Sequence, residues 1–365
     1  MKKIIQIEPW IDHEELDQLK RVIKNTFVTE YELTKEFESL IKDLTGSKYA
    51  VAITNGTAAL YCCLKALDIG EGDEVIVPNI TFIASANAVI MANAHPVFCD
   101  IDQKTLCIDT NKIESLITPA TKAIMPVHLY GQSADMDVIM EIAKKYNLKI
   151  IEDAAQGVGV KFNDQHVGTF GDTGILSFYG NKTITCGEGG VVLTDSKEIR
   201  DKVYQLKNHG RLTKGTFSHE SIGFNFCFTE MQAAVGIAQL NKLSRIKERK
   251  KDIHTKYCKL LESIKDTFKP IDIDSRTDPV WWFTSFLTND KSNLKDFLLK
   301  KEIQTREFFY PLHMQVCYTD MGLNGGFPVS EEIFSQGISL PSSYNLTDKD
   351  QDYVINSVLQ FYANK

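Results

Sequence analysis

The stretch Leu148-Lys149-Ile150-Ile151-Glu152-Asp153-Ala154-Ala155-Gln156 begins as an apolar run and ends in two acids followed by small residues. An apolar run of this length is typical of a strand buried on both faces of a mostly parallel sheet. In open α/β sheets, ligands bind at the carboxyl ends of the strands. The stretch therefore predicts a sheet strand whose end presents a carboxylate to a cationic ligand nitrogen. A helix cap or a solvated Asp153 is the alternative.

Strand-like and helix-like segments alternate along the chain on both sides of this stretch. Further apolar runs predict strands at residues 49–54, 74–78, 96–101 and 122–128. Helical periodicity lies between them, at residues 57–67, 82–92 and 135–146. Strands alternating with helices in this way predict an α/β fold with helices on both faces of a large, mostly parallel sheet.

The pattern changes after residue 173. Two strands are predicted at 174–178 and 190–194, and Thr229-Glu230-Met231-Gln232 has the form of a capping box that opens a long helix. The basic stretch 242–251 of that helix is predicted to be a solvated face. Residues 1–249 are expected to form a large domain and 250–365 a smaller α+β domain, in which Trp281 and Trp282 are expected to pack.

Composition narrows the class of protein. The chain has 365 residues, 43% of them hydrophobic, and its net charge of −7 argues against a nucleic-acid partner. The eight cysteines include no Cys-x-x-Cys pair, so reduced thiols are expected rather than disulfides or a metal site. Acidic residues follow the first two lysines too closely for a signal peptide, and no run reaches the length of a membrane span. We therefore expect a cytoplasmic protein with no membrane partner.

The residues from Ser177 to Gly190 contain a lysine between two apolar strands. They read Ser177-Phe178-Tyr179-Gly180-Asn181-Lys182-Thr183-Ile184-Thr185-Cys186-Gly187-Glu188-Gly189-Gly190. A buried lysine loses its proton more easily and can form an imine with a carbonyl compound. The segment alone leaves this possibility and a surface turn equally open.

A third segment, Asn55-Gly56-Thr57, lies between a predicted strand and a predicted helix. The backbone N–H groups at such a helix start can bind a phosphate, although a lone turn of this kind is weak support. Together, the phosphate turn, the acid and the lysine are the elements that pyridoxal phosphate requires, namely a lysine for the Schiff base and an acid at the pyridinium nitrogen.

The ordered set of these segments resembles the DegT/DnrJ/EryC1/StrS sugar-nucleotide aminotransferases, which belong to the aspartate-aminotransferase superfamily. The resemblance covers nearly the whole chain and includes residues 70–78 and the run Pro126-Val127-His128-Leu129-Tyr130-Gly131-Gln132. It implies a fold-type-I enzyme that uses pyridoxal phosphate. A non-catalytic regulatory protein of the same fold and an imine-forming aldolase are the weaker alternatives.

The resemblance also implies roles for individual residues. Lys182 would carry the cofactor as a Schiff base and move protons, and Asp153 would pair with the pyridinium nitrogen. Six further residues would bind the cofactor: Gly56, Thr57 and Ser177 at the phosphate, Gln156 near the ring hydroxyl, Phe82 stacked on the ring, and Asn225 at the phosphate of the neighbouring subunit. The last role implies a homodimer with shared active sites. A plain core phenylalanine is the alternative for Phe82.

Within the family, the sequences around Lys182 and the run Phe309-Tyr310-Pro311-Leu312-His313 look like those of the perosamine synthases. This similarity implies amino transfer from glutamate to C4 of a nucleotide-linked 4-keto-6-deoxy sugar, most simply GDP-4-keto-6-deoxymannose, with a UDP- or dTDP-linked sugar as the alternative. The residues expected at the substrate are Asn181, Glu188, Tyr310 and His313. A structural role for His313 is equally open.

One segment departs from the perosamine-synthase pattern. Residues 217–219 and 223–227 lack the tryptophan and the arginine usual there. This departure concerns which sugar and which nucleotide the protein would bind. The residues expected to bind the cofactor are all present.

Overall fold

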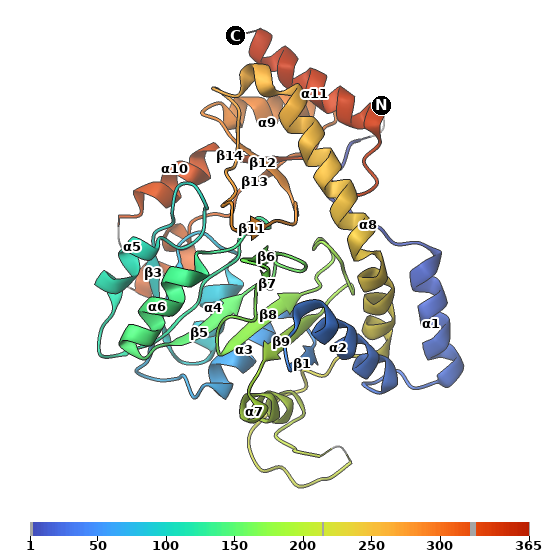
Figure 1. Ribbon diagram of the computed structural model, residues 1–365, viewed down its shortest axis with the longest axis vertical. Coiled ribbons are helices and arrows are strands. Elements are labelled where there is room, and N and C mark those ends of the chain that lie inside the picture. Colours follow the sequence, from blue (N-terminus) through green and yellow to red (C-terminus); the bar gives the residue numbers. More distant parts are fainter. Residues whose placement is uncertain (1–2, 214, 322–325, 365) are drawn as a thin grey trace.

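The computed structural model describes residues 3–213, 215–321 and 326–364. Figure 1 shows a broad lobe built around a central sheet and a smaller lobe at the top, where both ends of the chain lie. The long helix α8 (Glu230–Leu260) runs from one lobe to the other.

The central sheet has seven strands in the order β1-β9-β8-β5-β4-β2-β3. Every pairing from β8 to β3 is parallel, whereas β9 is antiparallel to both of its neighbours. The sheet is therefore mostly parallel, as the sequence predicts. Its strands are β1 (Tyr49–Ile53), β2 (Glu74–Pro78), β3 (His95–Cys99), β4 (Thr121–Ile124), β5 (Lys149–Asp153), β8 (Thr173–Ser177) and β9 (Gly190–Thr194).

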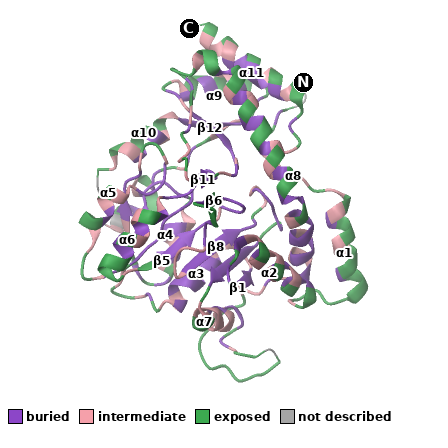
Figure 2. Ribbon diagram, in the orientation of Figure 1, coloured by how far each residue is buried: buried purple, intermediate pink, exposed green. Residues whose placement is uncertain are grey.

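Helices cover both faces of this sheet, and the strands are buried between them (Figure 2). Successive residues of β5 show why: Ile150 packs into one hydrophobic cluster and Ile151 into the other, because side chains alternate along a strand. One face is covered by α2 (Glu32–Thr45), α6 (Met136–Tyr146) and the first half of α8. The other is covered by α3 (Gly56–Ala66), α4 (Ala84–Met91) and α7 (Lys197–Lys207).

The small lobe contains an antiparallel sheet in the order β10-β12-β14-β13. Its strands are β10 (Lys269–Pro270), β12 (Thr284–Leu287), β13 (Arg306–Glu307) and β14 (Gly337–Leu340). Helices α9 (Lys291–Lys300) and α11 (Asp348–Ala363) pack on it around a third hydrophobic cluster that includes Phe286 and Tyr257. This combination is the α+β arrangement expected for the C-terminal region.

The two lobes share several elements. A small sheet joins β11 (Thr277–Asp278) to β6 (Lys161–Phe162) and β7 (Gln165–His166), and Ile4 pairs with Ile303. The predicted boundary at 249–250 falls inside α8, and the division into two domains stays a prediction. Other helical segments are α1 (His13–Asn25), α5 (Thr110–Ile113), α10 (Pro328–Gln336) and the 3-10 turns Glu114–Leu116, Glu262–Ile264, Leu312–Met314 and Val316–Met321.

Helix α8 confirms one prediction and corrects another. Thr229 caps it, and Gln232 completes the capping box. The prediction of a solvated basic face is wrong for Lys242 and Lys250, which are both buried. The amine of Lys242 donates to Asp12 and Glu15 at 2.7 and 2.8 Å because α1 packs against this part of the helix. A basic stretch in the sequence does not reveal what covers it.

Two further observations concern the whole described chain. All eight cysteines are free thiols. Within the described ranges, no helix combines the length and the apolar character needed to cross a membrane.

Candidate active site

A cavity of about 750 Å³ lies at the carboxyl ends of β1, β5 and β8, between the central sheet and the small lobe. This is the edge at which open α/β sheets bind ligands. Nine of the residues that the sequence singled out line it: Gly56, Thr57, Phe82, Asp153, Gln156, Ser177, Asn181, Lys182 and Glu188.

The first wall of the cavity is the start of α3. The side chain of Asn55 caps this helix by accepting a hydrogen bond from the N–H of Ala58 at 2.9 Å. The space beside it is tight: a Cβ on Gly56 would lie 3.2 Å from the Cβ of Ser177, and a Cβ on Gly190 would lie 2.5 Å from the carbonyl oxygen of Asn55. The glycines therefore let the turn, the helix start and Ser177 form one cradle. Free N–H groups and the helix dipole suit this cradle to an anion such as a phosphate.

The second wall is the end of β5, where two adjacent carboxylates face opposite sides of the sheet. Glu152 is fully buried away from the cavity and accepts hydrogen bonds from the N–H groups of Gly168, Phe170 and Gly171. Asp153 lines the cavity, and one of its oxygens accepts a hydrogen bond from the hydroxyl of Ser85 at 2.7 Å. Of the two acids in the motif, only Asp153 is placed to meet a ligand.

Gln156 follows on the same loop. Its side-chain oxygen accepts a hydrogen bond from the N–H of Tyr130 at 2.8 Å, which fixes the amide at the cavity wall. Tyr130 has a positive φ of 53°, and Gly131 has a φ of 86°. A side chain on Gly131 would overlap the carbonyl of Val280, so this sharp turn requires glycine.

Lys182 extends into the cavity from the loop between β8 and β9. Burial away from water lowers the pKa of Lys182 to about 8, while Asp153 acts to raise this pKa and Arg306 acts to lower it. The amine lies 4.5 Å from the centre of the Trp282 ring. No described residue accepts a hydrogen bond from it. A lysine in this state gives up its proton near neutral pH and can attack a carbonyl carbon.

The remaining predicted residues lie at or beyond the mouth of the cavity. Phe82 is 55% exposed and meets Phe309 edge-on, with 6.1 Å between ring centres. Asn225 is exposed on the loop after α7 and does not line this chain's own cavity, which is compatible with a contact to a second subunit.

Tyr310 and His313 also lie outside the cavity lining. The main-chain N–H of His313 donates to the side chain of Asn79 at 3.0 Å, and the His313 ring lies against the same amide. These contacts are those of a structural histidine. A role at the substrate stays a prediction for both residues.

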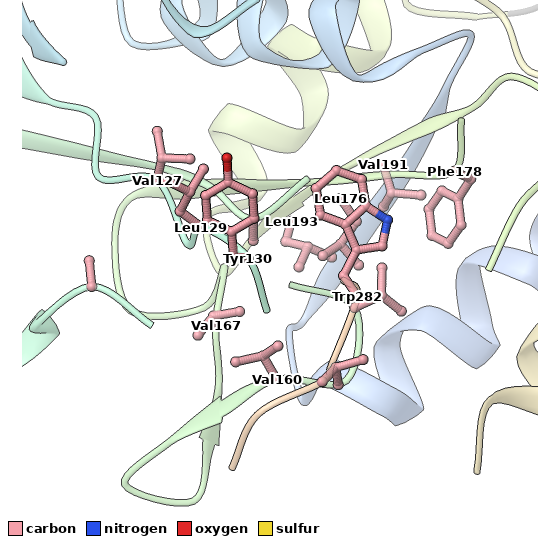
Figure 3. Packing of buried hydrophobic residues seen from close by; sticks show 14 of the residues in the cluster. Val127, Leu129, Tyr130, Val160, Val167, Leu176, Phe178, Val191, Leu193 and Trp282 are labelled. Carbon is pink, nitrogen blue, oxygen red and sulfur yellow. The ribbon is translucent and has the colours of Figure 1, made fainter. Parts of the chain in front are cut away.

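Among the site residues that sequence reasoning missed, four bear directly on its chemistry. Trp282, Arg306 and Phe309 line the cavity, and Ser85 binds Asp153. Trp282 was expected to pack within the small domain. It does belong to a buried cluster with Leu176, Val191 and Phe178 (Figure 3), but its ring also meets Lys182. The motif 309–313 was the only sequence feature that pointed to the segment containing Arg306 and Phe309. No sequence feature pointed to Ser85.

The arrangement combines three capacities in one cavity. It can hold an anionic group at the start of α3, a cationic ring nitrogen at Asp153 and a carbonyl carbon at Lys182. Among the described residues, no group of three or more His, Cys, Asp or Glu side chains could hold a metal ion.

Comparison with known proteins agrees with this chemistry. The profile of the DegT/DnrJ/EryC1/StrS aminotransferase family matches residues 9–359. The chain is 37% identical to the GDP-perosamine synthase of Escherichia coli O157:H7, covering 100% of both chains. It is also 37% identical to that of Caulobacter vibrioides, covering 99% of this chain and 98% of the relative. Among solved structures, the Helicobacter pylori aminotransferase PseC, which is involved in the biosynthesis of pseudoaminic acid, superimposes with a TM-score of 0.94 and 26% identity over 100% of both chains.

Proposed function

The chain belongs to the DegT/DnrJ/EryC1/StrS aminotransferase family, and from that premise we propose that it transfers an amino group from glutamate to C4 of GDP-4-keto-6-deoxymannose, giving GDP-perosamine. The coarser predictions are confirmed: the chain has the fold-type-I architecture and is a pyridoxal-phosphate-dependent sugar aminotransferase. The choice of sugar and nucleotide is the proposal.

The observation that carries the proposal is the convergence of Lys182, Asp153 and the Gly56–Ser177 cradle in one cavity. Gly56 and Gly190 keep this cradle together, because a Cβ at position 56 would crowd the side chain of Ser177 and one at position 190 would overlap the main chain of Asn55. The N–H groups at the start of α3 and the hydroxyl of Ser177 suit the cradle to the cofactor's phosphate. When bound, pyridoxal phosphate supplies an electron sink that stabilises the carbanion formed at the carbon bearing the amino group. For the sugar, support comes from full-length relatives named GDP-perosamine synthase.

Each residue has a distinct task in this proposal. The start of α3 and Ser177 would bind the phosphate, and Asp153, oriented by Ser85, would keep the ring nitrogen protonated. Lys182 would hold the cofactor through its amine and, as a neutral base, would accept and return a proton at Nζ. Its pKa near 8 suits this, because a general base works best when its pKa lies near the working pH.

We further propose that two chains form a homodimer in which Asn225 of each reaches the phosphate in the other. The loop that carries Asn225 projects away from the body below α7 (Figure 1), and its apolar side chains Phe217 and Ile222 are 94% and 86% exposed. Apolar side chains gathered on an exposed segment often mark an interaction surface.

The proposed enzyme works in the cytoplasm and supplies surface-polysaccharide synthesis.

A half-reaction experiment tests the function. The enzyme is loaded with pyridoxal phosphate, converted with glutamate to the pyridoxamine phosphate form and freed of excess amino acid. GDP-, UDP- and dTDP-linked 4-keto-6-deoxy sugars are then added separately while the cofactor absorption is followed. We expect the original absorption to return with the GDP sugar alone. If the absorption returns with another nucleotide, the substrate carries that nucleotide and not GDP. If glutamate causes no change in absorption, glutamate is not the amino donor.

A further inference from the structure

Trp282 contacts the active-site lysine in two ways. Its indole N–H donates to the carbonyl oxygen of Asn181 at 2.7 Å, so it holds the main chain immediately before Lys182. The face of its ring lies beside the amine, with 4.5 Å from the ring centre to Nζ. Trp282 is only 1% exposed, so the surrounding cluster leaves its ring little freedom to move.

The main chain of Trp282 is held in turn by a lysine from α8. The amine of Lys250, buried to 3% exposure, donates to the carbonyl oxygen of Trp282 at 3.0 Å and to that of Ser342 at 2.9 Å. Trp282 lies just before β12, and Ser342 lies just after β14. One amine therefore joins α8 to two segments of the small lobe at the side that faces the cavity.

These contacts form a continuous path from α8 to the reacting amine. We propose that Lys250 and Trp282 are positioning residues for Lys182: Lys250 fixes the main chain of Trp282, and Trp282 holds Lys182 through the carbonyl of Asn181 and the face of its ring. The proposal rests on the proposed role of Lys182 as the point of cofactor attachment.

The physical reason is the freedom of a lysine side chain. A lysine has four rotatable bonds and loses much rotamer entropy when it is held in one geometry. No described residue accepts a hydrogen bond from the Lys182 amine, and the indole of Trp282 packs beside it and limits the positions it can take. Without a fixed indole, the amine would spend less time where it can reach the carbonyl carbon of the cofactor.

Helix α8 offers a matched control. Lys242 is buried on the same helix, eight residues before Lys250, but its amine binds Asp12 and Glu15 and has no link to Trp282. Lys242→Met therefore removes a buried lysine of the same helix without breaking the proposed path.

The test compares two ligands of the cofactor-free enzyme. Pyridoxal phosphate attaches to the Lys182 amine with loss of water, and borohydride reduction followed by peptide mass analysis measures how much of Lys182 is occupied. Pyridoxamine phosphate has no aldehyde and binds without this bond. For Lys250→Met we expect covalent occupancy of Lys182 to need about tenfold more pyridoxal phosphate, with the affinity for pyridoxamine phosphate unchanged. Trp282 lines the cavity, so Trp282→Phe should lose clearly more in covalent occupancy than in affinity for pyridoxamine phosphate. The double variant should be no weaker than Trp282→Phe alone.

Each other outcome has a definite meaning. Equal losses for both ligands, or the same selective loss in Lys242→Met, would show a general structural effect and overturn the inference. Unchanged covalent occupancy in Lys250→Met would also overturn it. If Lys250→Met does not fold, Trp282→Phe decides by the same two titrations. If the cofactor attaches to a different lysine in the wild-type enzyme, the proposed role of Lys182 is refuted.

Discussion

Two lysines with lowered pKa values, the half-buried Lys182 in the active-site cavity and the fully buried Lys250 at the junction of α8 with the small lobe, differ in what their amines contact. Burial lowers the pKa of Lys182 to about 8 and the pKa of Lys250 to about 7. The amine of Lys250 donates to two carbonyl oxygens. The amine of Lys182 faces the cavity beside Asp153 and Arg306.

A lowered pKa is therefore not confined to the lysine in the cavity. Burial alone makes an amine easy to deprotonate, but a reactive amine also needs room for a carbonyl carbon and groups that hold the rest of the ligand. Only the Lys182 region has both, since the phosphate cradle and Asp153 line the same cavity. A low pKa taken alone would not distinguish the two lysines.

The largest expected effect separates the two lysines by activity. Lys182→Ala should lower the rate of amino transfer from glutamate by about 10²- to 10⁴-fold, because it removes the group that we propose moves the proton. Lys250→Met should lower it far less, because the proton-transfer group stays in place. Single-turnover absorption of the bound cofactor measures both rates. The proposed difference between the two lysines is wrong if Lys182→Ala still transaminates, or if Lys250→Met has the lower rate of amino transfer.

A smaller effect concerns stability and its dependence on pH. The pKa of Lys182 is lower in the folded chain than in the unfolded chain, where it is near 10.5. The unfolded state therefore binds more protons between about pH 8 and pH 10.5, and wild-type stability rises with pH across this window. In Lys182→Met this rise should flatten, and at pH 7 the cofactor-free variant should be more stable by about 1–3 kcal/mol.

At about pH 10 the free energy of unfolding reports mainly on the contacts of the two amines, because deprotonating either amine then costs little. Lys250→Met leaves two buried carbonyls without a donor and should lose about 1–3 kcal/mol, whereas Lys182→Met should stay close to the wild type. Urea denaturation of the cofactor-free proteins gives both values. Equal losses would mean that the Lys182 amine has a hydrogen-bond partner after all.

The two regions also differ in how far the sequence predicted them. The strands and the cavity residues from 55–57, 153–156 and 177–182 were predictable because a local pattern places each at the carboxyl end of a strand, and such ends share one edge. Nothing local reveals that Lys250 is buried, because its neighbours in the sequence are charged and its partners lie 32 and 92 residues away. Trp282 and Arg306 were missed as cavity residues for the same reason: the small lobe brings them to the cavity.

The smallest expected effect tests whether Lys182, unlike Lys250, responds to its charged neighbours. Arg306 lines the cavity, and its guanidinium lies over the ring of Phe283, with no hydrogen bond to a described side chain. Its positive charge disfavours a second positive charge on Lys182 and so lowers the Lys182 pKa. Arg306→Gln should therefore raise this pKa and move the midpoint of pyridoxal phosphate attachment to higher pH. Because Arg306 is partly exposed, solvent screening should keep the shift to a fraction of a pH unit.

The control for this shift is Arg21→Gln, which removes an exposed arginine that pairs with Glu36 and is not part of the cavity lining. The rate of covalent attachment, measured against pH in cofactor-free protein, should give the same midpoint for this control and the wild type. A midpoint that stays unchanged in Arg306→Gln would mean that burial alone sets the pKa of Lys182, as it does for Lys250. The two lysines would then differ only in access to the cavity, and the charges around Lys182 would serve the ligand rather than the amine.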